Sequence, residues 1–140
     1  MSINEKQNEI IEEFESFDDW MDRYQLIIDY ANELKKHPMP EEDKIDRNKI
    51  DGCQSTVWFT VRMEEGRLVF NGDSDALLVK GIVALLLTVL SGHTPKEILD
   101  ADLYFIDRIG LREHLSPTRS NGVAAMLKQM KLYAMAYQAK

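Results

Sequence analysis

The sequence predicts an α+β fold, in which a small antiparallel sheet of about three strands packs against helices. Apolar residues recur at helical spacing through the first 34 positions and again from position 77 onward, whereas positions 56–70 are rich in β-branched and aromatic residues with partial alternation. The chain has 140 residues, of which 44% are hydrophobic and 29% charged. This length and composition favour one globular domain, residues 1–140, around a single core.

Two helices are expected at the start of the chain, over residues 3–17 and 20–34. Their apolar residues follow a period near 3.6, and the pattern is broken near residues 16–19. Ser16 or Asp18 is expected to cap the second helix, because short oxygen-bearing side chains accept hydrogen bonds from free helical amides. The prolines at positions 38 and 40 are expected to end this helix in an exposed loop over 37–43.

The sheet is expected from a hairpin over residues 56–63 and 67–70, which turns at Glu65-Gly66. A short strand over 48–50 would precede the hairpin and complete three strands, since two strands alone are marginal. Residues 71–76 then form an expected turn, in which Asp73 or Ser74 caps the next helix at the positive end of its dipole.

The second half of the chain is expected to be helical. Residues 77–90 are apolar on nearly every side, which predicts a central helix. Thr94, Pro95 and Glu97 form a capping-box pattern that starts a further helix, and Ser116-Pro117 starts the last one in a similar way.

Charge and hydropathy narrow the classes of partner. The chain carries 17 Lys and Arg against 24 Asp and Glu, a formal charge of −7, with no segregated basic patch. It should therefore not bind nucleic acid. No apolar stretch reaches the roughly 20 residues that span a bilayer, and the acidic first residues do not resemble a secretory signal. We expect a cytoplasmic protein with a protein partner and no membrane association.

Cys53 is the only cysteine, and it lies at an expected turn before the firm strand. Judged from the residues alone, a lone cysteine is more often a small core filler. Gly52 and the polar neighbours Asp51, Gln54 and Ser55 favour an accessible thiol instead. One cysteine and three scattered histidines make a poor metal or cluster site, so no metal is expected. Without a second cysteine, a persulfide on Cys53 could not be expelled within the chain.

Other candidate residues have simpler structural interpretations. His37, His93 and His114 each lie near a helix end or a break, so a cysteine hydrolase, which pairs its thiol with a histidine, is the weaker alternative. Asp73 and Asp75 are expected to fix their loop rather than act as a catalytic pair. Arg119 either pairs with an acid or lies near Cys53 and favours the thiolate, and the residues leave both options open.

Several motifs together resemble the SufE family of cysteine desulfuration proteins. They occur in order over nearly the whole chain: Gly52-Cys53-Gln54-Ser55 with Val57-Trp58, Gly72-Asp73-Ser74-Asp75-Ala76, Val79-Lys80-Gly81, and Ser116-Pro117-Thr118-Arg119-Ser120-Asn121-Gly122. The resemblance implies a SufE/NifU-like (IscU-like) fold, similar to the scaffold proteins of iron-sulfur cluster assembly.

The resemblance also implies a function. Proteins of this family are not autonomous enzymes: they take sulfur from the persulfide of a PLP-dependent, SufS-like cysteine desulfurase, stimulate that enzyme and pass the sulfur to a SufBCD-type scaffold. Cys53 would carry the persulfide, with Gly52, Gln54, Asp73, Asp75 and Arg119 as supporting residues. PLP would belong to the partner, and this chain would need no cofactor.

Two alternatives stay open. The protein could activate a desulfurase by binding without carrying sulfur, or it could be a CsdE-type acceptor that serves a different desulfurase. The sequence also leaves the oligomeric state undetermined, with a homodimer as one option.

Overall fold

Two amphipathic helices begin the chain in the computed structural model, which describes residues 1–139. Helix α1 spans Ile3–Glu15 and helix α2 spans Trp20–Leu34. The cap of α2 differs from the expectation: Asp19 accepts a hydrogen bond from the Met21 amide at 3.0 Å, so neither Ser16 nor Asp18 is the cap. Ser16 instead closes the end of α1. Asp19 lies directly before the first helical residue, which is the geometry that N-capping requires.

The sheet contains two strands, β1 (Val57–Glu64) and β2 (Arg67–Ser74), rather than three. The expected first strand is reduced to a single bridge between Lys49 and Trp58, because residues Asp46–Asn48 form the short 3-10 helix η2. Another 3-10 helix, η1, spans Glu41–Asp43. Strand β2 continues beyond its expected end at Phe70 as far as Ser74. The motif that resembled a turn is therefore largely strand.

The hairpin has one face that is buried and one that is more exposed. Val57 and Phe59 are buried, and they lie on the same face as Phe70 and Gly72 of β2. Gly72 has a packing role, because a β-carbon there would lie 2.7 Å from the Phe59 ring. Trp58 pairs with Asp73 on the opposite face. The buried face points toward helix α3.

Helix α3 (Leu77–Leu90) is the central helix, and it packs against α1, α2 and β2. Ten of its residues are buried, in agreement with its apolar composition. Its contact with α2 is close at Gly81, where a β-carbon would overlap the Ile27 backbone. The helix begins at Leu77 with Ala76 as its N-cap and no side-chain capping bond.

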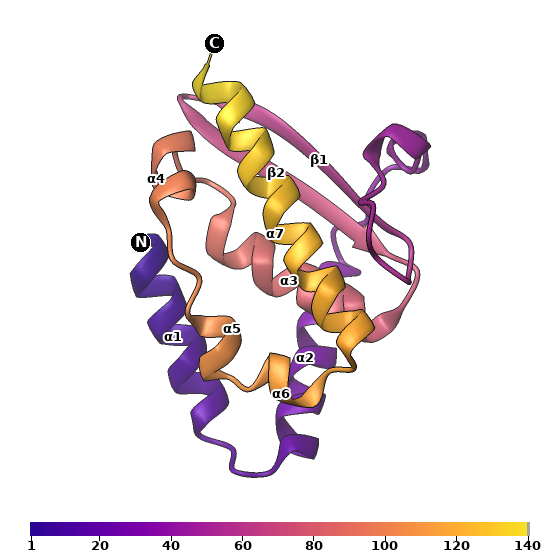
Figure 1. Ribbon diagram of the computed structural model, residues 1–140, viewed down its shortest axis with the longest axis vertical. Coiled ribbons are helices and arrows are strands. Elements are labelled where there is room, and N and C mark those ends of the chain that lie inside the picture. Colours follow the sequence, from indigo (N-terminus) through magenta and orange to yellow (C-terminus); the bar gives the residue numbers. More distant parts are fainter. Residues whose placement is uncertain (140) are drawn as a thin grey trace.

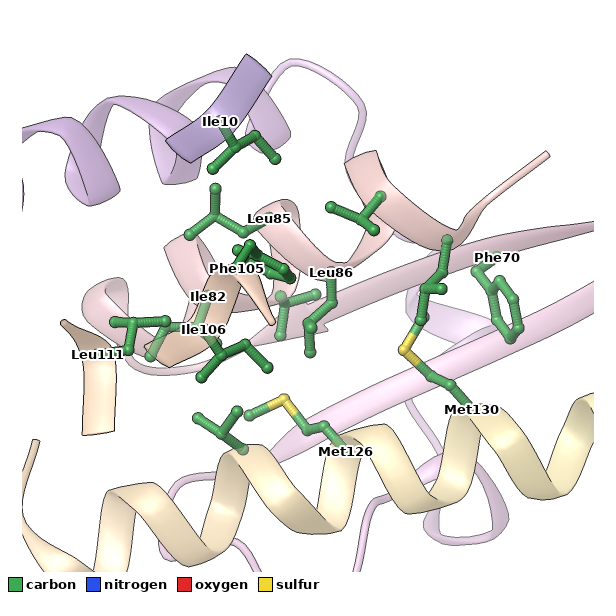
Figure 2. Close-up of a cluster of buried hydrophobic side chains, with 14 of the residues drawn as sticks. Ile10, Phe70, Ile82, Leu85, Leu86, Phe105, Ile106, Leu111, Met126 and Met130 are labelled. Carbon is green, nitrogen blue, oxygen red and sulfur yellow. The ribbon is translucent and has the colours of Figure 1, made fainter. Parts of the chain in front are cut away.

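The chain then forms four helices: α4 (Pro95–Asp100), α5 (Phe105–Arg108), α6 (Leu111–His114) and α7 (Pro117–Gln138). The capping box of Thr94 and Glu97 and the Ser116 cap are as expected, whereas the short helices α5 and α6 were not anticipated. Helix α7 crosses in front of α3 and the hairpin (Figure 1). Its Met126 and Met130 point from α7 into the core toward Leu86 and Phe70 (Figure 2).

Candidate functional site

The loop that carries Cys53 is held between the start of β1 and the surface of α7. The Ile50 amide donates a hydrogen bond to the Val57 carbonyl at 2.9 Å, which closes the loop at its base. Gly52 has φ +90°, and a β-carbon there would lie 3.3 Å from the Ala125 side chain. Glycine meets both demands, a left-handed backbone and a close approach to α7.

The Cys53 thiol is half-buried against α7. Its Sγ lies 3.6 Å from the Gly122 carbonyl oxygen, to which it can donate a weak hydrogen bond. Beneath the loop is a cavity of about 20 Å³, which we call the thiol cavity; among the residues that line it, besides Cys53, are Val79, Ile82, Gly122 and Met126. This volume accommodates about one water-sized atom.

A second hollow, of about 230 Å³, lies around the loop itself, lined by residues 49–57. Cys53 lines this outer hollow as well as the thiol cavity. The sulfur therefore lies at the boundary between an apolar interior and a more open polar surface.

Burial raises the pKa of the Cys53 thiol. This follows from physical principle, because an apolar environment disfavours the thiolate. Arg119 lies in the wall of the thiol cavity but is itself exposed. Within residues 1–139 its guanidinium forms no ion pair with an acid. Its assistance to the thiolate stays a prediction, and in this closed arrangement burial is the cause that sets the thiol pKa.

Asp75 fastens the far end of the loop to the start of α3. Its carboxylate Oδ1 accepts a hydrogen bond from the Thr56 amide at 3.0 Å, and its own amide donates to the Thr56 carbonyl at 3.2 Å. The Ser74 hydroxyl also donates to that carbonyl, at 2.9 Å. Asp75 is exposed, so this clamp is accessible to solvent and to a partner.

Asp73 lies in a different cluster. Its side chain, 9% exposed, accepts bonds from Lys44 at 3.2 Å and Lys80 at 3.0 Å. Burial alone would raise the pKa of Asp73, but the bonds from Lys80, the Ser74 amide and Lys44 hold that pKa below its usual value. The expectation that Asp73 caps α3 is therefore wrong, because its carboxylate is used in these contacts and the N-cap of α3 is Ala76. Ser74 comes closer to that role, since its hydroxyl accepts a bond from the Ala76 amide.

Of the remaining candidate site residues, Gln54 lies at the Cys53 thiol and the three histidines lie away from it. Gln54 is exposed and lines both hollows beside Cys53. The histidines lie elsewhere: His114 stacks on Trp20, His93 is buried near Glu97, and His37 lines a separate pocket. No histidine of residues 1–139 lines either hollow at Cys53. The sequence motifs included Val79 and Gly122 but did not reveal that they surround the thiol.

Residues 1–139 contain neither a candidate metal site nor a candidate membrane span. Across residues 1–139 no three His, Cys, Asp or Glu side chains gather in a way that could hold a metal ion. In the same part of the chain no helix is both long enough and apolar enough to cross a membrane.

The fold and the site together define a small α+β protein with one half-buried loop thiol over an apolar cavity. Residues 8–134 match the model of the SufE family, described as an Fe-S metabolism associated domain. The chain belongs to the SufE family, whose role is in iron-sulfur metabolism.

Individual proteins agree with this assignment. An uncharacterized SufE-like protein of Synechocystis sp. is 43% identical over 129 residues, which cover 92% of this chain and 80% of that protein. One from Rhizobium meliloti is 39% identical over 129 residues, covering 89% and 91%. The solution structure of a hypothetical protein from Thermus thermophilus has a TM-score of 0.78, with 23% identity and coverage of 96% and 97%. That structure supports the fold.

Proposed function

We propose that this protein carries sulfane sulfur on Cys53, accepting it from the persulfide of a PLP-dependent, SufS-like cysteine desulfurase and passing it to a SufBCD-type scaffold. The observation that supports this most directly is the thiol cavity, because the only thiol of the chain adjoins apolar space for about one further atom. We further propose that residues 1–140 act as one SufE-like domain in the cytoplasm.

The transfer conserves electrons and protons. The Cys53 thiolate attacks the outer sulfur of the enzyme persulfide, a new bond forms between this sulfur and Sγ, and the bond to the enzyme cysteine breaks. The enzyme cysteine leaves as a thiolate and takes up the proton that Cys53 gave up. No oxidant, metal or cofactor of this chain enters the step, and PLP acts only in the partner.

The half-buried position of Cys53 suits a sulfur carrier, which must expose its thiol for transfer and then shield the transferred sulfur. In the closed loop, burial keeps the thiol protonated and weakly nucleophilic. An opened loop would expose Sγ on the side of the outer hollow, where docking of the desulfurase and the nearby Arg119 can favour the thiolate. After transfer, return to the thiol cavity would shield the new sulfur from oxidants and other thiols.

A hydrolase is less well supported, because no histidine among residues 1–139 lines either hollow beside the thiol. The module that activates a desulfurase without carrying sulfur, and the CsdE-type acceptor for a different desulfurase, are separated from our proposal by experiment. A homodimer also stays a prediction.

The decisive experiment is intact mass spectrometry after incubation with cysteine and a cysteine desulfurase. We expect a gain of one sulfur atom that a reductant reverses and that Cys53→Ser lacks. A matched variant, Ser55→Cys in the Cys53→Ser background, restores a thiol two positions away and should not restore transfer. If Cys53→Ser stimulates the desulfurase as fully as the wild type, the protein is an activating module. Comparing SufS-type and CsdA-type enzymes identifies the cognate partner.

A further inference from the structure

A second pocket, separate from the thiol cavity, has a positively charged lining. It has a volume of about 140 Å³ and lies between the end of α2, the loop before η1, strand β2 and helix α3. Lys35, Lys44 and Lys80 line it together with Asp73, so we call it the lysine pocket. The three lysines are opposed by Asp73 in the lining and by Glu41, which pairs with Lys44 from outside it, so one positive charge is left in excess, in a chain whose formal charge is −7.

Asp73 fixes two of these cations in place without saturating them. Its Oδ2 lies 3.2 Å from the Lys44 ammonium, and its Oδ1 lies 3.0 Å from the Lys80 ammonium. An ammonium group has three N–H donors. Lys80 has one acceptor among the described residues, and Lys44 has Asp73 and Glu41. The side chains of Lys80 and Lys44 are mostly buried, at 17% and 23% exposed, and both line the pocket, so a bound anion could accept from their remaining donors.

The rest of the lining is largely apolar, from Leu34, Pro38 and Met39, with the exposed His37 at the rim. Apolar walls cannot satisfy the additional oxygens of a phosphate or sulfate, whose burial without hydrogen bonds is unfavourable. An anion that has one charged end and a short hydrocarbon part fits both halves of the lining. We propose that the lysine pocket binds a carboxylate attached to a short apolar group.

Trp58 provides a spectroscopic probe of this site. The Lys44 ammonium lies 5.7 Å from the centroid of the Trp58 ring, and the buried indole Nε1 has no hydrogen-bond partner among the described residues. An anion that draws the Lys44 ammonium changes the field at the indole. The other tryptophan, Trp20, can be replaced by phenylalanine, which keeps an aromatic ring against His114.

The test titrates the Trp20→Phe protein with butyrate and, at matched ionic strength, with inorganic phosphate, following Trp58 fluorescence. We expect saturable binding of butyrate in the millimolar range and markedly weaker binding of phosphate. In Lys35→Gln, which leaves the Asp73 ion pairs intact, butyrate affinity should fall about three- to fivefold, the loss expected for one exposed ionic contact. Lys36→Gln is the matched control, because Lys36 pairs with Glu33 outside the pocket.

Absence of a saturable response, equal affinity for phosphate, or equal losses in the Lys35 and Lys36 variants would overturn the proposal. Another arm, which rests on the proposed function, locates the source of the carboxylate. Butyrate that competes with desulfurase binding, and does so less in Lys35→Gln, assigns the carboxylate to the partner protein. Butyrate that binds without competing assigns it to a free small molecule. Cys53→Ser should bind butyrate normally, so failure of sulfur transfer and failure of this inference are separable.

Discussion

Substitution of Gly122 by alanine tests the thiol cavity most directly. A β-carbon at this position would lie 3.6 Å from the Cys53 Sγ, an ordinary van der Waals contact, so the unmodified thiol can stay in place. Gly122 lies within α7, where replacing glycine by alanine stabilises a helix by about 0.8–1.0 kcal/mol. We therefore expect Gly122→Ala to raise the free energy of unfolding by about that amount.

The same methyl group should impair storage of sulfur. It would occupy most of a cavity that holds about one water-sized atom, so an added sulfur could no longer be buried there. Burying one group of this size is worth about 0.8 kcal/mol, which corresponds to about a fourfold change in an equilibrium constant. The persulfide of Gly122→Ala should accordingly be lost to a reductant about four times faster than that of the wild type.

Asn121→Ala is the matched control for Gly122→Ala. Asn121 is exposed on the same turn, so its replacement should also favour the helix but should leave the cavity unchanged. Urea unfolding measures stability, and intact mass against time in dithiothreitol measures persulfide loss. Equal lifetimes in the two variants would refute the assignment of the cavity to the carried sulfur, and a destabilised Gly122→Ala would refute the packing argument.

Three further predictions concern the loop and its surroundings. Asp75→Ala removes the acceptor for the Thr56 amide, which fastens the end of the Cys53 loop. Since such a bond contributes about 0.5–1.5 kcal/mol, the loop should open more often and alkylation of Cys53 should accelerate about two- to tenfold. Asp75→Asn, which keeps an acceptor, should accelerate alkylation less. Asp73→Asn breaks two partly buried ion pairs and should lower the free energy of unfolding by about 3 kcal/mol at pH 7. Because the pKa of Asp73 is depressed in the folded state, the stability difference between wild type and variant, measured by urea unfolding, should disappear as the pH falls through that folded-state pKa. The raised pKa of Cys53 predicts stability that is complete below the ordinary thiol pKa and declines as the pH rises through the folded-state value, so Cys53→Ser should show a flatter stability profile in alkali.

The sequence was sufficient for features that depend on neighbouring residues. Helical periodicity located α1 and α2, a run of residues that are apolar on nearly every side located α3, and the Thr94 and Glu97 pattern located a cap correctly. Gly52 indicated the turn at Cys53, and its φ of +90° confirms the need for glycine there. Each of these features follows from a period, a cap or a backbone angle.

Features that depend on contacts between residues far apart in the sequence could not be predicted from local patterns. Asp73 looked like a helix cap in a turn motif, but pairing of β2 with β1 and two lysines from other segments draw it into the strand. The expected strand over 48–50 formed one bridge because η2 uses the preceding residues. The contact of Cys53 with Gly122 joins residues 69 positions apart, and no local pattern specifies that distance.

Helix α7 supplies both the floor beneath the Cys53 sulfur and, through Met126 and Met130, part of the hydrophobic core (Figure 2). The floor therefore cannot retreat without disturbing the packing of the whole domain, whereas the loop above it has no regular secondary structure to lose. On the proposed function, a cavity of about 20 Å³ on this fixed base admits a single sulfur atom. A longer polysulfide chain would extend outside the cavity, where other thiols can reduce it.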